Sequence, residues 1–276
     1  MELEQKCNHL ILVDTHVHIY DCFNIDKLLN SAWNNFYNHA DECGQKENFT
    51  GILLLTETSK DNWFTSLLNQ LEQKDSTQSL STEWTFSTTA ETSSVFASNS
   101  EGKKLILIAG RQVITSEKLE VLALISDQNF TDGLSLEETI KDIQEKNGIA
   151  VLPWGVGKWL GKRGKLIDNL LQENSLSPVF LGDNSGRPQF WLQPTYFQVV
   201  KQQGWNILPG TDPLPLATEA SRPGSFGLKM KGAINEQEPA KQLKSILLSC
   251  EGNWQSYGSL EKPWRFVRNQ IAMRLK

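Results

Sequence analysis

The sequence predicts an α/β fold, because short apolar segments alternate with amphipathic ones along a chain of 276 residues. Short, nearly continuous apolar runs are typical of strands that are buried on both faces of a mostly parallel sheet. The length suits a single α/β barrel. We therefore expect a TIM-like β/α barrel that forms one domain over residues 1–276.

Seven apolar runs are expected to form the strands of this barrel. In chain order they read LILVD, GILLLTE, KLILIAG, EVLALIS, GIAVLPW, PVFLGDN and WNILPGTD. The clearest helix is SLEETIKDIQEKNG, in which Ser135 and Glu138 form a capping box and Asn147 and Gly148 end the helix. Amphipathic patterns predict further helices near residues 25–40, 59–73, 164–173, 194–203, 237–249 and 262–275.

Two segments lie outside this alternation. Residues 76–100 contain 14 Ser or Thr among 25 residues, a composition that fits either a linker or a polar hairpin. Because Trp84 and Phe86 are poorly suited to a flexible tether, a hairpin insertion is the preferred interpretation. Residues 224–276 are expected to form a loop over the barrel mouth and helices that dock through Trp264, Phe266, Val267 and Ile271.

Composition restricts the possible partners and the compartment. The net charge of −5 argues against a nucleic-acid partner, which would require a broad basic face. No apolar run approaches the roughly 18 residues of a membrane span. The N-terminus has acids where an export signal needs basic residues. A cytoplasmic protein that binds a small molecule is expected, with its four cysteines kept as thiols. The oligomeric state is left open.

The first expected strand ends in DTHVH, and this ending suggests a metal site. Side chains two residues apart on a strand project to the same face, so Asp14, His16 and His18 are expected to share one side. Imidazoles and carboxylates are common metal ligands, and barrels place their chemistry at the C-terminal ends of strands. The alternative is a strand end with solvated polar residues.

The last expected strand also ends at an acid, Asp212, in the run ILPGTDPLP. In a closed barrel the last strand neighbours the first, which would place Asp212 opposite His16 and His18. Asp212 and Pro213 could instead simply begin a turn. The two strand endings together favour a functional site.

The opening DTHVH and the closing GTDPLP resemble those of the amidohydrolase-type and PHP-type metal-dependent hydrolases, and the segments between them resemble the PHP family more closely. The resemblance spans residues 9 to about 215 and implies a barrel, either regular or distorted to seven strands, with metal ions at the strand ends. Residue by residue, Gln112 stands where that family has a Glu, Glu120 where it has a His, and Trp154 where it has a His. Asp212 keeps the closing acid, and Leu214 replaces the histidine that follows it.

These departures imply a reduced set of metal ligands. The chain has four histidines, and His9 and His39 lie at positions unsuited to the site. His16, His18 and Asp212 could still hold one divalent ion, zinc or manganese, because three protein ligands plus water form a catalytic zinc arrangement. Glu57, Glu120 and Gln112 are alternative donors.

The loops after the later strands offer residues for substrate binding. Asp183 and Arg187 follow one strand, and Trp154 and Lys158 follow another in PWGVGKWLGKRGK, which holds four cations within eight residues. Such a cluster could attract an anionic substrate, although charge runs often only solvate a helix.

Two functions follow. The first is a hydrolase that uses a metal-activated water on an ester, phosphoester or amide, with Asp212 as a ligand or as the base. The second is a barrel that has lost its catalytic ligands and binds an anionic metabolite or a protein without turnover.

Overall fold

The computed structural model describes residues 9–73, 80–173, 178–202, 207–249 and 254–275. Cys7, Cys250, residues 76–79 of the expected insertion, and residues 205–206 at the start of WNILPGTD lie outside these ranges. The strands are β1 (Leu10–Val17), β2 (Phe49–Leu55), β3 (Trp84–Thr88), β4 (Ser94–Asn99), β5 (Lys104–Ile108), β6 (Gly110–Ile114), β7 (Glu120–Leu124), β8 (Ile149–Pro153), β9 (Val179–Asn184), β10 (Ile207–Gly210), β11 (Phe226–Lys231) and β12 (Gln255–Gly258).

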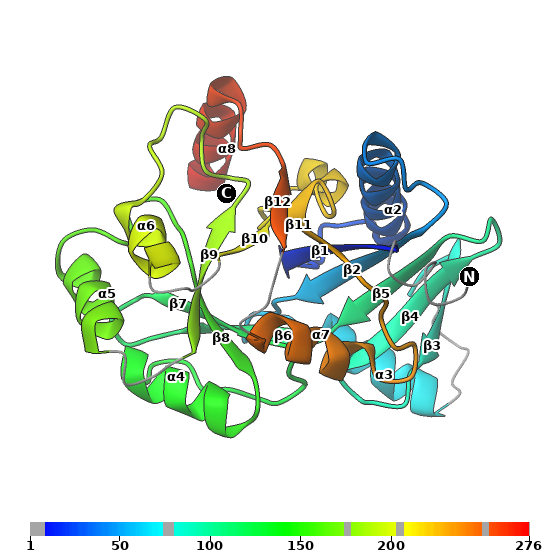
Figure 1. Cartoon of the computed structure of the whole chain (residues 1–276), viewed down its shortest axis with the longest axis horizontal. Coiled ribbons are helices and arrows are strands. Elements are labelled where there is room, and N and C mark those ends of the chain that lie inside the picture. The colour runs from blue at the N-terminus through cyan, green and yellow to red at the C-terminus, as the bar shows by residue number, and fades with distance from the viewer. Residues whose placement is uncertain (1–8, 74–79, 174–177, 203–206, 250–253, 276) are drawn as a thin grey trace.

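The strands form two mixed sheets, shown in Figure 1. The seven-stranded sheet has the order β12-β11-β1-β2-β5-β4-β3, and the five-stranded sheet has the order β10-β9-β8-β7-β6. The sheets approach each other where β1 lies beside β10 and where β2 lies beside β6. In the described part of the chain no strand ladder joins them.

The expectation of a TIM-like or distorted seven-stranded barrel is therefore wrong. The sheets do not close, and parallel pairing is confined to β1, β2 and β5 in one sheet and to β8, β9 and β10 in the other. β7 pairs antiparallel with both β6 and β8, whereas a TIM barrel needs parallel neighbours throughout. Apolar runs predict that a strand is buried, and they do not encode its direction.

The core explains why the strands are apolar on both faces. In β1, Leu10 and Leu12 pack on one side with Leu53 of β2, whereas Ile11 and Val13 pack on the other side with strands of the five-stranded sheet. The second of these clusters lies between the two sheets and includes apolar residues of β2, β5, β7, β8 and β9. A continuous hydrophobic run is the expected pattern for such a strand.

Helices cover the outer faces of both sheets. α2 (Ile25–Glu42) and α3 (Trp63–Gln73) pack on the seven-stranded sheet, and α4 (Leu136–Glu145), α5 (Lys162–Glu173) and α6 (Thr195–Gln202) pack on the five-stranded sheet. α7 (Pro239–Leu248) packs against the core between the sheets, and α8 (Pro263–Leu275) follows β12. The predicted helices are confirmed, including the capping box of Ser135 and Glu138 on α4.

The Ser/Thr-rich segment contains β3 and β4, which pair antiparallel and extend the seven-stranded sheet beside β5. Trp84 is buried in the core that α2 and α3 cover. Cys22 is exposed and Cys43 is half-buried, and both are free thiols. Among the described helices, none is both long enough and apolar enough to cross a bilayer.

The predicted docking face of α8 is wrong for three of its four residues. Trp264, Val267 and Ile271 are 62%, 52% and 54% exposed, whereas Phe266 is half-buried and meets Phe190 edge to face. The helix is held instead by polar contacts of its other face: Arg265 and Asn269 both donate to Oε1 of Glu219, which is almost fully buried. An apolar pattern shows that a helix is amphipathic, but it does not show which face meets the protein.

Candidate functional site

The site lies where the ends of β1 and β10 meet, and a bulge in β1 orients its histidines. The pairing of β1 with β2 shifts register between Asp14 and Val17. Val17 and Ile19 therefore join the same core cluster as Leu10 and Leu12, which reverses the alternation of faces along the strand. The predicted sharing of one face by Asp14, His16 and His18 fails for this reason, and Asp14 is separated from the histidines.

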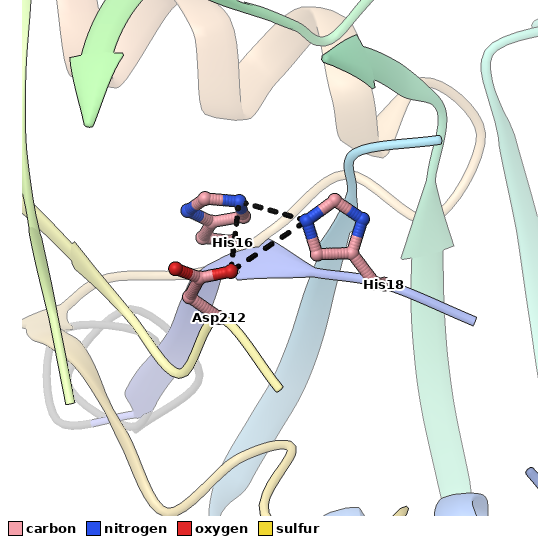
Figure 2. Close-up of side chains that lie close together, drawn as sticks. All are labelled: His16, His18 and Asp212. Carbon is pink, nitrogen blue, oxygen red and sulfur yellow. Dashed lines mark hydrogen bonds and ion pairs between the residues drawn. The ribbon is translucent and has the colours of Figure 1, made fainter. Parts of the chain in front are cut away.

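His16, His18 and Asp212 converge, as Figure 2 shows. The two Nε2 atoms are 3.1 Å apart, and Asp212 Oδ1 lies 3.5 Å from His16 Nε2 and 3.6 Å from His18 Nε2. In a tetrahedral zinc site with bonds of about 2.0–2.1 Å, ligand atoms are about 3.3 Å apart. The spacing of the three atoms matches one face of such a tetrahedron. Within the described residues no other group of His, Cys, Asp and Glu side chains has this geometry.

Asp14 is not one of the candidate ligands, but it holds the backbone of the site in place. Its side chain is fully buried and accepts hydrogen bonds from Thr211 N (2.8 Å), Thr211 Oγ1 (2.6 Å) and Gly224 N (2.9 Å). Burial raises the pKa of Asp14 to about 7, and these donors oppose that rise. Asp14 therefore fixes the segment that carries Asp212 to the end of β1.

Asp212 is held in an uncommon backbone conformation. Its φ is +46°, a region that few non-glycine residues adopt, and its N–H donates to the carbonyl oxygen of His16 at 2.8 Å. The side-chain amide of Asn184, at the end of β9, donates to Asp212 Oδ2 at 2.9 Å and to the carbonyl of Trp154 at 2.7 Å. One carboxylate oxygen is thereby occupied, and Oδ1 faces the imidazoles.

The electrostatics favour neutral imidazoles, the form that binds metals. Burial lowers the pKa of both His16 and His18 to about 4. Burial also raises the pKa of Asp212, and the neighbouring His18 and Lys158 oppose that rise. His18 Nδ1 is buried without a hydrogen-bond partner among the described residues, so no protein acceptor fixes the ring's tautomer.

His18 and Asp212 open into a cavity of about 360 Å³, a size within the usual range of small-molecule sites. Four other predicted residues line it: Gln112, Glu120, Trp154 and Lys158. Lys158 and Glu120 form an ion pair with each other. Gln112 is close enough for hydrogen bonding to the imidazoles, which partly opposes the fall in their pKa.

Three predicted site residues lie elsewhere. Glu57 lines a separate cavity, pairs with Arg111 at 3.1 Å and accepts the N–H of Phe64 at 2.6 Å. Arg187 is buried, and its guanidinium forms a two-pronged ion pair with Asp183, with N–O distances of 2.9 and 2.7 Å. Neither Asp183 nor Arg187 lines the cavity, because Asp183 near the end of β9 and Arg187 just after the strand satisfy each other.

The cavity also contains residues that the sequence analysis missed: Tyr20, Glu219, Arg222 and Glu261. Arg222 is buried and pairs with both Glu219 and Glu261. These residues lie in loops and in a short 3₁₀ helix (Ala217–Ser221), where no periodic pattern marks them. A search for acids and arginines grouped just after GTDPLP would have found Glu219 and Arg222.

Neither a protein-family model nor a curated protein sequence matches the chain. Among solved structures, the chain is similar to PsfC from Pseudomonas syringae PB-5123, with 13% identity, coverage of 97% of this chain and 98% of that one, and a TM-score of 0.59. This likeness concerns the fold alone.

A two-domain protein from Bacteroides vulgatus ATCC 8482, described as containing a predicted PHP-like metal-dependent phosphoesterase, is more distant. It is 11% identical over 91% of this chain and 66% of that one, with a TM-score of 0.45. A similarity of this size supports no conclusion about function.

Proposed function

We propose that the chain is a metal-dependent hydrolase that holds one divalent ion, zinc or manganese, through His16, His18 and Asp212. The observation that carries the proposal is the triangle of donor atoms with sides of 3.1, 3.5 and 3.6 Å. Two buried neutral imidazoles and one carboxylate are a donor set that suits these ions. A bound divalent ion supplies an acidified water and polarises the oxygen of an ester, phosphoester or amide.

The residues around the triangle prepare it for this chemistry. Asn184 occupies Asp212 Oδ2, which leaves Oδ1 as a single donor toward the ion and makes Asp212 a better ligand than base. Glu120 is a second carboxylate in the same cavity, where it pairs with Lys158. Because Asp212 is committed to the candidate ion, Glu120 is the acid left to accept a proton.

The expected preference for an anionic substrate remains a prediction. It was based on free cations in the loops, and the cations at the cavity are not free. Lys158 and Arg222, the cations that line the cavity, are both paired with acids, and Arg187 is paired with Asp183. An anionic group would therefore have to bind at the ion itself or displace one of these acids.

Metal analysis tests the proposal before any substrate is known. Protein purified without chelators should contain about one equivalent of zinc or manganese, and titration of the stripped protein with zinc should show one tight site. His18→Ala and Asp212→Ala should each lose that site. His39→Ala is the control, because His39 lies on α2, stacked on Tyr257, far along the chain from the triangle. Unchanged zinc binding in His18→Ala and Asp212→Ala would refute the assignment.

The alternative is a metal-binding or metabolite-binding protein without turnover. It is favoured by the small ligand set, since the described residues bring together one group of three donors and Trp154 lines the cavity where the resembled families place a histidine. A zinc-loaded chain that hydrolyses none of a panel of aryl esters, aryl phosphates and anilides would favour this alternative.

A further inference from the structure

A small pocket beside the candidate metal centre is walled by four aromatic side chains. Trp154 meets Trp191 edge to face, with ring centroids 5.9 Å apart, and Trp159 meets Tyr196 in the same way at 5.7 Å. The Tyr196 hydroxyl is already satisfied, because it donates to the carbonyl of Gly164 at 3.0 Å. The pocket therefore presents ring surfaces, together with Thr195 at its wall.

This pocket adjoins the cavity of the candidate metal centre. Trp154 and Gly155 line both spaces. The carbonyl of Trp154 accepts a hydrogen bond from the same Asn184 amide that holds Asp212. The wall between the two spaces is therefore fixed relative to the candidate ligand Asp212.

The size and lining of the pocket indicate its occupant. Its volume is about 140 Å³ and the pocket is open to solvent on one side; a single benzene ring fits an enclosed cavity of about 150 Å³, so the space matches one ring. Among the described residues that line it, none is charged. At its rim Leu160 and Trp191 are 65% and 38% exposed, so apolar surface remains in water until a ligand covers it.

Aromatic pockets also bind quaternary ammonium groups. Here no carboxylate lines the pocket to offset the charge of such a group: Asp168 interacts with the hydroxyl of Tyr196, and Glu120 in the adjoining cavity is paired with Lys158. A neutral ring fits this environment better than a cation does.

We propose that the pocket binds a neutral aromatic ring of the substrate, so that the substrate is an ester, phosphoester or amide with an aromatic substituent near the bond that is cleaved. The assignment of the ring to a substrate rests on the proposed hydrolase function. The binding of the ring itself does not, because the pocket contains no predicted metal ligand.

The probe is 4-fluorobenzamide, and its binding is followed by broadening of the ¹⁹F signal with and without zinc. Wild-type protein should broaden the signal in both conditions. Trp191→Ala should weaken the binding on the order of tenfold, because it removes one ring of an edge-to-face pair. Leu160→Ala, at an exposed position that cannot unfold the chain, should weaken it less. Trp264→Ala is the matched control, since Trp264 is an exposed tryptophan on α8 that does not line the pocket.

The outcomes separate the two proposals. No broadening by the wild-type protein, equal broadening by Trp191→Ala, or stronger binding of choline than of 4-fluorobenzamide would each overturn the ring pocket. Specific ring binding by a protein that binds no zinc would support the pocket and overturn only the hydrolase assignment. Zinc binding by a protein that does not bind the ring would support the metal site and overturn the ring pocket.

Discussion

Asn184 is a small residue with a large expected effect at the site. Its amide nitrogen lies between two acceptors, Asp212 Oδ2 and the Trp154 carbonyl, so the orientation of the side chain is fixed. It thereby decides which oxygen of Asp212 faces the histidines. Loss of a residue that hydrogen-bonds a metal ligand typically reduces metal affinity by about 10-fold to 100-fold.

Replacing Asn184 tests this role. Asn184→Leu keeps the branched shape of the side chain but removes the donor, and it should reduce zinc affinity by about 10-fold to 100-fold. Asn129→Leu, at an exposed position on another loop, should leave the affinity unchanged. Calorimetric titration of the stripped proteins gives both values. Equal affinity for Asn184→Leu and the wild type would show that Asp212 is positioned by its backbone alone.

The buried histidines should make the stability of the metal-free protein depend on pH. Burial lowers the pKa of His16 and His18 from 6.5 to about 4, so between these values the unfolded chain binds protons that the folded chain does not. Stability therefore rises as pH rises through this window. Asp14 acts in the opposite direction, because its pKa is raised from 3.8 to about 7 and the folded chain binds its proton more tightly.

Asp212 and Glu57, whose pKa values are also raised by burial, act in the same direction as Asp14, so the contribution of the histidines is isolated by removing them. A His16→Gln/His18→Gln double variant should lower the slope by up to about 2.7 kcal/mol per pH unit, which corresponds to two protons. Urea unfolding in the presence of a chelator, at several pH values within this window, measures it. A variant with the wild-type slope would place the responsible protons on other groups.

At the scale of one element, α8 is attached to the protein mainly through charge. Glu219 is almost fully buried and accepts hydrogen bonds from Arg265 and Asn269 of α8. Arg222 forms ion pairs with both Glu219 and Glu261. Removing one member of a buried ionic cluster leaves its partners uncompensated. The same helix contributes Phe266, Gln270 and Met273 to the cavity, so its docking also shapes the site.

Glu219→Ala should therefore destabilise the protein by about 3 kcal/mol. The loss should appear first as faster hydrogen exchange across residues 263–275 and as cleavage there by proteases. Glu238→Ala is the control, because it breaks an exposed pair with Lys241 that contributes less than about 1 kcal/mol. Protection of α8 that is unchanged in Glu219→Ala would mean that apolar contacts hold the helix.

At the scale of the whole molecule, the junction of the two sheets depends on close backbone approach. β1 and β10 are adjacent without a ladder, and Thr15 Oγ1 donates across the junction to the Pro209 carbonyl at 2.9 Å. A Cβ on Gly210 would lie 2.4 Å from the backbone nitrogen of His16. Only glycine permits this approach.

Gly210→Ala should consequently displace the end of β1, lower the melting temperature and weaken zinc binding together. Gly44→Ala offers a comparison, because a Cβ there meets no atom and the cost is limited to its φ of +68°, about 1 kcal/mol. Differential scanning calorimetry and zinc titration on both variants separate crowding from backbone strain. Wild-type zinc affinity in Gly210→Ala would contradict a rigid junction.

The sequence predicted most elements because burial and amphipathicity are local properties, but the segment expected as a loop over the mouth is the strand β11, which pairs antiparallel with β1. The apolar runs became β1, β2, β5, β7, β8, β9 and β10, and the end of the first run supplied His16 and His18. The closed barrel was wrong because strand direction depends on the path between strands. The antiparallel β6–β7 pair arises from the short turn after Ile114, which apolar patterns do not specify.

The site was predicted only where chemistry follows directly from a strand end. Asp212 meets the histidines, whereas Arg187 turns back to Asp183 four residues earlier, a pairing that depends on local backbone geometry. The spacing of Asp14 and His16 in the sequence predicts that they share one face of β1, but the bulge in β1 puts them on different faces. Arg222 and Glu261 enter the cavity from distant loops and carry no local signal.

His16 lies at the end of β1 in one sheet and His18 follows the strand, whereas Asp212 follows β10 of the other sheet, so the three donors span the junction. An ion bound only by the folded form adds about 2.7 kcal/mol of stability when its concentration is a hundred times Kd. That energy opposes separation of the sheets in particular, since separation breaks the donor triangle. Amides of β1 and β10 should gain exchange protection together when zinc is added, while those of β3 and β4 at the sheet edge gain none. The metal-free chain should then open as two cooperative units and the zinc-loaded chain as one.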